Sequence, residues 1–294
     1  SAYRKNHSTE TALLKITNDI LLNMNKQHVT LLVVLDLSAA FETIDQDILL
    51  DRMSTKLGIE GVVLKCFGSY LKGRSQRVAV HGAVSEKFDL SWGVPQGSCL
   101  GLILFTIYGS ELFNVIKNHL PNVHCFADDT ELYLSFNPSK EHGDVKAAKS
   151  MELCVNDIKN WMSKDKLLMN DVKTEFLIIG TRQQLEKVDL NCISIGAVDI
   201  SPSNSPIKSL GVWLDRNLSM DAHITRTCST AFYYLYNIRR IRPYLSRQTT
   251  EILVHTFITS TLDYCNSLFY GIPSYQLHKL QRIQNAAARL IFRE

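Results

Sequence analysis

The sequence predicts an α+β protein in which a small β-sheet with helices beside it precedes a basic helical tail. Two patterns predict strands: a short apolar run bounded by polar residues, as at residues 29–35, and alternation of apolar with polar residues, as on both sides of residues 128–129. Longer stretches with apolar residues at steps of three and four predict helices, and these fill the chain after residue 220. The length of 294 residues leaves room for two or three subdomains.

Helices and strands alternate in the first half of the chain. Ser8 or Thr9 is a suitable N-cap for the first helix, and Gly58 and Gly73 are suitable ends for the next two. The expected elements are helices at about 8–21, 46–57 and 62–71, strands at 29–35, 78–80 and 88–92, a tight loop at 93–98 and a long apolar helix at about 99–119.

The second half opens with a hairpin. Apolar residues alternate with polar ones on both sides of residues 128–129, which places this pair at the tip. The elements expected after it are a helix at about 141–168, strands at 174–179, 193–200 and 207–214, and helices at 224–238, 252–262 and 277–291.

Asp36 directly follows the apolar run at residues 29–35, which suits a buried central strand. A charge at the end of such a strand costs several kcal/mol unless it is paired or bound to a metal. A structural aspartate would cap the following helix, but Ser38 is able to take that place. Asp36 is therefore a candidate functional carboxylate.

Asp128 and Asp129 stand at the tip of the expected hairpin. Aspartate is common in turns because its side chain accepts hydrogen bonds from nearby backbone N–H groups, so a structural role for this pair stays open. The presence of Asp36 at another strand end favours a functional role for the pair. Strand-end carboxylates that meet in space repel each other, and a bound divalent cation removes the repulsion. Oxygen ligands without a convincing His or Cys set indicate Mg²⁺ or Mn²⁺.

Composition narrows the class of protein. Seven scattered cysteines without a Cys-x-x-Cys pair indicate reduced thiols. No secretory signal opens the sequence, and no apolar run approaches the ~20 residues of a membrane span, so we expect an intracellular protein of the cytoplasm or nucleus without membrane contact.

Charge is distributed unevenly along the chain. Of the net charge of +3, residues 216–294 carry +6 and the first 215 residues carry −3. An acidic metal-binding body with a basic tail suits an enzyme that grips a polyanion. A solvated basic helical surface accounts for the same distribution and stays open.

Five ordered motifs give a more specific indication. They are residues 36–41 (DLSAAF), 93–101 (GVPQGSCLG), 126–129 (FADD), 170–176 (NDVKTEF) and 210–212 (LGV). In this order they resemble the reverse transcriptase of non-LTR (LINE-type) retrotransposons, close to the L2/CR1-like group. Residues 3–10, 262–266 and 284–289 also resemble stretches of that family, so the likeness covers nearly the whole chain. The ordered set is specific, whereas any one motif alone is weak.

The resemblance implies a right-hand polymerase fold. Partial fingers would occupy residues 1–30, and the palm residues 31–220, with finger-proximal helices and strands at about 45–92. An α-helical basic thumb would occupy residues 221–294. The implied reaction is RNA-directed DNA synthesis with two Mg²⁺ or Mn²⁺ ions, in which the primer 3′-oxygen attacks the α-phosphate of a dNTP. The implied partners are an RNA template, a DNA primer and dNTP.

The resemblance also assigns roles at the catalytic centre. Asp36 and Asp128 would bridge the two ions, and Asp129 would be the outer ligand. Lys173 is a candidate for protonating or neutralising the pyrophosphate leaving group, with a solvated strand-end lysine as the alternative. Phe41 would block a ribose 2′-hydroxyl, with an ordinary core phenylalanine as the alternative.

Further residues would contact the substrates. Gln96 and Gly97 would shape the template and nucleotide pocket, and Arg77 would touch a template phosphate unless it is simply an exposed strand residue. The thumb residues expected to face the duplex backbone are Arg226, Arg239, Arg240 and Arg242.

Some residues depart from the family pattern. Glu42 stands where relatives usually carry Asp, Leu102 where Pro is usual, and Gly109-Ser110 where Asn-Asp is usual. None of these removes a catalytic carboxylate. Relatives usually also carry more fingers sequence and an endonuclease domain, and residues 1–294 show neither.

Two other functions stay open. One is a catalytically inactive relic or domesticated nucleic-acid-binding protein of the same fold. The other is a different two-metal palm enzyme such as a cyclase. Phe41, the Pro-Gln-Gly loop and the basic tail argue against this second alternative.

Overall fold

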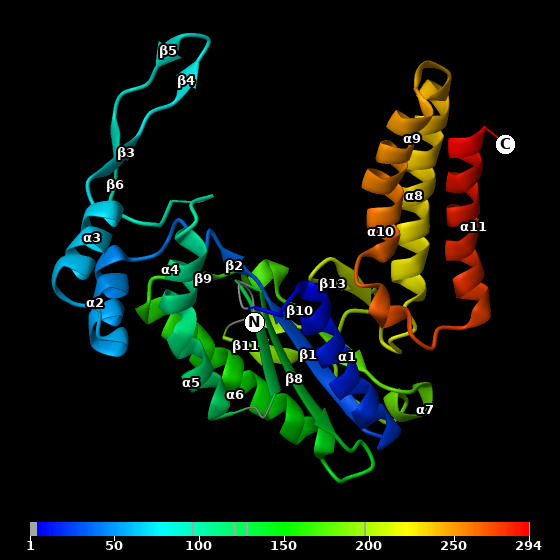
Figure 1. Ribbon diagram of the computed structural model, residues 1–294. Helices are drawn as coiled ribbons and strands as arrows, with labels where there is room; N and C mark the ends of the chain where they lie inside the picture. Colours follow the sequence, from blue (N-terminus) through cyan, green and yellow to red (C-terminus); the bar gives the residue numbers. More distant parts are fainter. Residues whose placement is uncertain (1–4, 96, 120–121, 128, 197, 294) are drawn as a thin grey trace.

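The computed structural model describes residues 5–95, 97–119, 122–127, 129–196 and 198–293. Gln96 and Asp128, two of the expected site residues, lie outside this part of the chain. Figure 1 shows a central body, a narrow arm at residues 74–90 and a column of helices after residue 220, with the arm and the column on opposite sides of the body.

A four-stranded antiparallel sheet forms the centre of the body. Its order is β10 (Glu175–Ile179), β1 (Val29–Leu35), β8 (Asp129–Phe136) and β7 (Asn122–Phe126). Thr30 pairs with Ser135 of β8, and their two hydroxyl groups share a hydrogen bond of 2.8 Å. The expected strands at 29–35 and 174–179 and the expected hairpin are confirmed.

β1 is buried along its whole length because helices cover both faces of the sheet. The side chains of Val29, Leu31, Val33 and Leu35 join a cluster with α4 (Gly101–Tyr108), α5 (Leu112–Lys117) and α6 (Gly143–Lys164). Leu32 and Val34 join a second cluster with α1 (Thr9–Asn25). Figure 1 shows α1 and α6 on opposite sides of the sheet. The uninterrupted apolar run at 29–35 therefore reflects burial on two faces.

The arm is a long hairpin that leaves the body after α2 (Gln46–Leu57) and α3 (Gly61–Leu71). It consists of two short ladders, β3 (Arg74–Gln76) with β6 (Phe88–Leu90) and β4 (Ala79–Val80) with β5 (Ala83–Val84). His81 and Gly82 form its turn with φ of 48° and 88°, as a two-residue turn between twisted strands requires. The strands expected at 78–80 and 88–92 are thus parts of one hairpin, and Trp92 lies beyond it.

The single helix expected at 99–119 is wrong. The structure has α4, a tight 3₁₀ turn at Gly109–Glu111 and then α5. Glycine in a helix interior loses more backbone entropy than other residues, which favours a break at Gly109. The preceding residue, Tyr108, is fully buried, and its hydroxyl donates to the carbonyl oxygen of Asp165, which fixes where α4 ends.

The helix expected at 141–168 ends earlier, at Lys164. Lys166 has a left-handed φ of 57°, and the N–H of Leu167 donates to the carbonyl of Met162 at 2.8 Å. This is the hydrogen-bond pattern of a Schellman helix end. The next residues form β9 (Leu168–Met169), which pairs with β2 (Leu37–Ser38) beside Asp36.

The strands expected at 193–200 and 207–214 are also hairpins. β11 (Ile193–Ile195) pairs with β12 (Val198–Ile200), and β13 (Ile207–Ser209) pairs with β14 (Val212–Leu214). The second turn, at Leu210 and Gly211, has φ of 43° and 85°. Two positive φ values suit a type I′ turn, which apolar alternation alone does not reveal.

In the C-terminal column, α8, the continuous segment from α9 to α10, and α11 lie side by side (Figure 1). They are α8 (Asp221–Ile241), α9 (Arg247–Val254) continued by a π-turn at His255–Thr259, α10 (Ser260–Asp263) and α11 (Ser274–Phe292). Its core is continuous with the α1 face of the sheet. The expected helices are confirmed in type and approximate position.

The remaining short elements connect these parts. They are 3₁₀ turns at Asp171–Lys173, Arg242–Tyr244 and Asn266–Phe269, and the helix α7 (Arg182–Leu185). Within the described residues, no helix combines the length and the apolar character that crossing a membrane requires.

Candidate active site

The sheet register brings Asp36 and Asp129 to one end of neighbouring strands. The last residue pair of the β1–β8 ladder is Leu35 with Thr130. Asp36 and Asp129 each lie one residue further on, and Asp129 also pairs with Phe126 of β7. Residues opposite each other on neighbouring strands have Cβ atoms about 5 Å apart. The register therefore places Asp36 and Asp129 at one end of neighbouring strands, and the expectation that their carboxylates meet stays a prediction, while Asp128 lies outside the described residues.

Lys173 approaches the same point from the other side of β1. Its ammonium nitrogen lies 3.4 Å from Asp36 Oδ2. Asn170 holds the segment in place, because its N–H donates to the carbonyl of Asp36 at 2.9 Å and its Oδ1 accepts from the N–H of Lys173 at 3.3 Å. A cation and two carboxylates thus stand in one row across the end of the sheet.

The hairpin turn that carries Asp129 has a costly backbone conformation. Ala127 has a φ of 57°, in the left-handed region that a two-residue hairpin turn requires at its first position. An L-residue other than glycine in this region costs roughly 1–2 kcal/mol. Such strain persists where the surrounding structure over-determines the position, and it is concentrated at functional sites.

Asp36 has the features of a cation ligand. Its Oδ2 atom is shielded from solvent and accepts no hydrogen bond within the described part of the chain. A carboxylate oxygen in this condition fits a hard divalent cation. No group of three or more His, Cys, Asp and Glu side chains that could hold a metal is found among the described residues, a set that leaves out Asp128.

A second carboxylate, Glu131, lies two residues beyond Asp129 on the same face of β8. It is 2% exposed and accepts a hydrogen bond from the hydroxyl of Ser209. Burial, with a further contribution from Asp129, raises the pKa of Glu131 to about 7. His124 stands opposite Glu131 on β7, and burial lowers the pKa of His124 to about 4. Both groups therefore prefer the neutral form more than they do in water.

Phe41 and the loop at residues 93–98 form one unit. The N–H of Val94 donates to the carbonyl of Phe41 at 2.9 Å. A Cβ atom on Gly93, which has a φ of 79°, would lie 2.9 Å from the carbonyl oxygen of Glu42, so only glycine fits this approach. Phe41 is half-buried, and its ring centroid lies 5.1 Å from that of Phe105 on α4. Gly97 is exposed, and Gln96 lies outside the described residues.

Two residues that the sequence did not single out hold this loop. The carbonyl of Gly93 accepts hydrogen bonds from the Arg74 guanidinium at 2.5 Å and from the Gln46 side chain at 3.2 Å. Arg74 follows Gly73 at the base of the arm, and Gln46 begins α2. Their only signal in the sequence is a position beside a helix boundary, which does not reveal a contact 19 or 47 residues away.

The structure separates the arginines that were expected to contact nucleic acid. Arg77 is exposed on the arm, between β3 and β4. Arg226 lies over the ring of Trp213, with its guanidinium carbon 3.7 Å from the ring centroid. Arg239 and Arg240 are exposed on α8.

The expectation that Arg242 faces the duplex backbone is wrong. It is 8% exposed, and its guanidinium donates to the carbonyls of Leu245, Leu290 and Ile291, each at 2.9 Å. Leu290 and Ile291 belong to the last turn of α11, whose carbonyls lack helical partners. Arg242 therefore closes the end of a helix, and we withdraw it from the surface that meets nucleic acid.

Comparison with known proteins agrees with this geometry. The sequence profile described as reverse transcriptase (RNA-dependent DNA polymerase) matches residues 1–214. The chain belongs to the reverse transcriptase family. The observed α+β architecture agrees with the right-hand polymerase fold that this membership implies.

Curated relatives include reverse transcriptases of insect transposons. The probable RNA-directed DNA polymerases from transposon BS and from transposon X-element of Drosophila melanogaster are each 25% identical to this chain. The matches cover 98% of this chain and 32% and 31% of those proteins, so the chain spans about a third of their length.

Solved structures of telomerase show a more distant likeness. Apo telomerase from Candida tropicalis has a TM-score of 0.47 and 15% identity, over 98% of this chain and 51% of that chain. Telomerase from Candida albicans in complex with a TWJ fragment of telomeric RNA has a TM-score of 0.45 and 12% identity, over 98% and 49%.

Proposed function

We propose that this chain is the core of an RNA-directed DNA polymerase, which extends a DNA primer with dNTPs on an RNA template. The observation that carries the proposal is the row of Lys173, Asp36 and Asp129 at one end of the sheet, in a chain of the reverse transcriptase family. We take residues 31–220 as the palm, residues 1–30 with about 45–92 as parts of the fingers, and residues 221–294 as the thumb.

We assign Asp36, Asp129 and the undescribed Asp128 as the residues that hold two Mg²⁺ or Mn²⁺ ions. When bound, such ions stabilise the attacking and leaving oxygens of an in-line phosphoryl displacement. The solvent-shielded Oδ2 of Asp36 supports the assignment because, among the described residues, it accepts no hydrogen bond and has only the Lys173 ammonium 3.4 Å away as an ion-pair partner. The contact with Lys173 also supports it, because a mobile ammonium is able to balance Asp36 and then move away.

Lys173 acts on the leaving group in this proposal. Its side chain is 69% exposed, so the ammonium has room to swing from Asp36 toward a pyrophosphate. A cation at that place neutralises the charge that develops as the bond to the α-phosphate breaks.

Phe41, Gln96 and Gly97 shape the nucleotide pocket in this proposal. The backbone of Phe41 is held by the hydrogen bond from the N–H of Val94, and its ring packs against the ring of Phe105. A bulky ring at this place suits the exclusion of a ribose 2′-hydroxyl by steric clash.

The primer–template lies against the C-terminal helices in this proposal. A groove of about 370 Å³ is lined by Lys208, Trp213, Arg226 and Tyr264, at the junction of the β13–β14 hairpin with α8 and α10. Cations and hydroxyl groups in one groove suit phosphate oxygens. Arg239 and Arg240 extend the positive surface along α8, and Arg77 offers a cation on the arm for the template.

Primer extension on an RNA template with Mg²⁺ tests the function, with a template-free reaction as the blank. Asp36→Asn keeps the size of the side chain but loses its charge, so we expect it to abolish extension and to leave binding of a labelled primer–template nearly unchanged. Asp51→Asn is the matched control, because Asp51 is exposed on α2 and belongs to none of the assigned site residues.

Two results would count against the proposal. Extension by Asp36→Asn at the parental rate would show that the assigned site is wrong. A parent protein that binds primer–template but never extends it would favour the inactive nucleic-acid-binding alternative.

A further inference from the structure

A groove lies between α8 and α11, and α11 stands on the side of the C-terminal column away from the arm (Figure 1). The two helices run parallel. At their N-terminal ends the Tyr275 hydroxyl donates to the Asp221 carboxylate at 3.1 Å, and at their C-terminal ends Arg242 donates to the carbonyl of Leu290. The groove has a volume of about 240 Å³ and is lined by Phe232, Leu235, Tyr236, Arg239, Ala286 and Leu290. It shares none of these residues with the groove at the β13–β14 hairpin.

α8 presents two aromatic rings and a cation to this groove. Phe232, Tyr236 and Arg239 follow one another at steps of four and three residues, so they share one face of the helix. Phe232 is 45% exposed and Tyr236 is 61% exposed. Rings that stay open to water beside a cation offer the kind of platform on which a nucleobase stacks.

α11 supplies further cations along the opposite wall. Ala286 lines the groove, and Arg282 and Arg289 stand four residues before and three residues after it on the same face of the helix. Both arginines are exposed. Lys279, three residues before Arg282, continues the row toward the N-terminal end of the helix. The small side chain of Ala286 leaves the space between the two guanidinium groups open.

The charge of these two helices is of one sign. α8 beyond Asp221 and the whole of α11 contain no acidic residue. Within the described residues, none of the groove cations Arg239, Lys279, Arg282 and Arg289 forms an ion pair with a carboxylate. Solubility alone accounts for exposed cations but not for exposed rings set between them. A polyanion with flat apolar groups matches both features.

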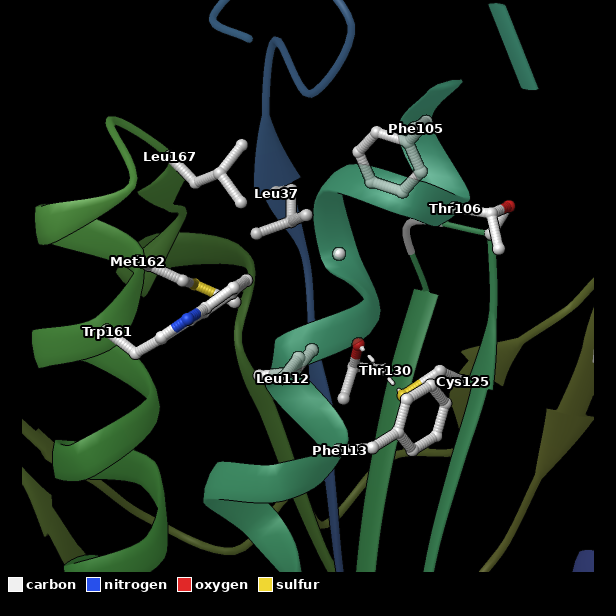
Figure 2. A pocket seen from close by; sticks show the side chains of 12 residues that line it. Leu37, Phe105, Thr106, Leu112, Phe113, Cys125, Thr130, Trp161, Met162 and Leu167 are labelled. Atoms are coloured by element: carbon white, nitrogen blue, oxygen red, sulfur yellow. Dashed lines mark hydrogen bonds between the residues drawn. The ribbon is translucent and has the colours of Figure 1, made fainter. Parts of the chain in front are cut away.

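Size separates this groove from the cavity beside the β7–β8 hairpin. There the side chains of Phe105, Phe113 and Trp161 surround a space of about 70 Å³ (Figure 2). The groove between α8 and α11, with about 240 Å³, combines a larger volume with guanidinium groups at its edges.

We propose that the groove between α8 and α11 binds a single-stranded segment of nucleic acid. Phe232 and Tyr236 stack against its bases, and Arg282 and Arg289 contact its phosphates. The occupant is a single strand because the bases of a duplex are paired and stacked on one another and so do not reach a protein ring. The site holds a strand that is not part of the primer–template duplex, and its binding does not rest on the proposed function.

Fluorescence anisotropy with labelled single strands of about twelve nucleotides tests the stacking platform on the full chain. One probe is oligouridylate and the other oligodeoxythymidylate, and the tighter of the two identifies RNA or DNA as the source of the strand. We expect Phe232→Leu and Tyr236→Leu each to weaken binding at least about fivefold, the lower end of base–aromatic stacking. Tyr270→Leu is the matched control, because Tyr270 is 97% exposed and does not line this groove. Melting curves verify that the variants fold.

Salt titrations test the phosphate contacts. Arg282→Ala and Arg289→Ala should each lower the slope of log affinity for the single strand against log salt by about 0.7. Arg182→Ala on α7 makes the same charge change at a side chain that is 90% exposed, and it should leave the slope unchanged. Equal slopes for these three variants would overturn the proposal. Weaker binding by the arginine variants with no effect of Phe232→Leu and Tyr236→Leu would also overturn it, since the face would then be a general basic surface.

Competition separates this site from the proposed primer–template groove. An unlabelled blunt RNA–DNA hybrid at saturating concentration should leave most of the labelled single strand bound, and complete displacement would overturn the proposal. No binding of either single strand to the parent would overturn it as well. If the protein bound no hybrid and extended no primer, the proposed function would fail, and the stacking and salt measurements would still decide the groove.

Discussion

A buried ion pair joins α2 to the end of α6, and breaking it gives a sharp test of how the body is held together. An Nη atom of Arg52 lies 2.7 Å from Asp165 Oδ1, and each residue is only 8% exposed. The same guanidinium donates to the carbonyl of Tyr108 at the end of α4, and the Tyr108 hydroxyl donates to the carbonyl of Asp165. Three helices therefore meet in one network.

The expected loss follows from this burial. Two unit charges 2.7 Å apart attract by about 6 kcal/mol at an effective dielectric constant of about 20. Desolvation costs several kcal/mol for each ion, so the intact pair contributes little net stability. Arg52→Met removes one partner and leaves Asp165 buried without its cation. We expect the free energy of unfolding to fall by about 4 kcal/mol.

The assay is urea unfolding of the parent, Arg52→Met, Asp165→Asn and the double variant. The two single losses should not add, because the double variant buries no unpaired charge. Lys56→Met on the same helix is the control, since Lys56 is 59% exposed in its 3.3 Å pair with Glu111, and its loss should stay below about 1 kcal/mol. Equal losses for Arg52→Met and Lys56→Met, or strictly additive losses in the cycle, would refute the reasoning.

Three further predictions concern other parts of the chain. Phe41→Val should raise ribonucleotide incorporation roughly tenfold or more in a competition of rNTP against dNTP, whereas a lower melting temperature with unchanged sugar discrimination would return Phe41 to the core. Arg226→Ala and Arg240→Ala should each lower the slope of log affinity for primer–template against log salt by about one unit, and an unchanged slope would mean that these arginines face solvent. Burial lowers the pKa of His124 from 6.5 to about 4, so its contribution to stability is present above pH 6.5 and is lost as the pH falls through 4. His124→Gln should therefore lose less stability than the parent between those pH values, by up to about 3 kcal/mol in urea unfolding, and parallel pH profiles would contradict this.

The sequence by itself determined the elements whose signals are local. An uninterrupted apolar run located β1, apolar alternation located the β7–β8 hairpin, and helical spacing located α1 and α8, because each pattern follows directly from which faces the element buries. The sequence also pointed to Asp36 and Asp129, because an acidic residue directly after or before a predicted buried strand is costly unless its charge is paired or bound. The sequence pattern does not reveal tight turns as clearly as strands. The hairpins at 193–200 and 207–214 were therefore expected as single strands.

Only the tertiary structure decided which side chains meet. Lys173 reaches Asp36 because β10 and β1 are neighbours in the sheet, although 137 positions separate the two residues in the chain. Arg242 has the same basic side chain as Arg240, yet it is buried because the carbonyls at the end of α11 lie within its reach. In each case the deciding contact joins residues that are distant in sequence, and the local periodicity of apolar residues does not predict such a contact.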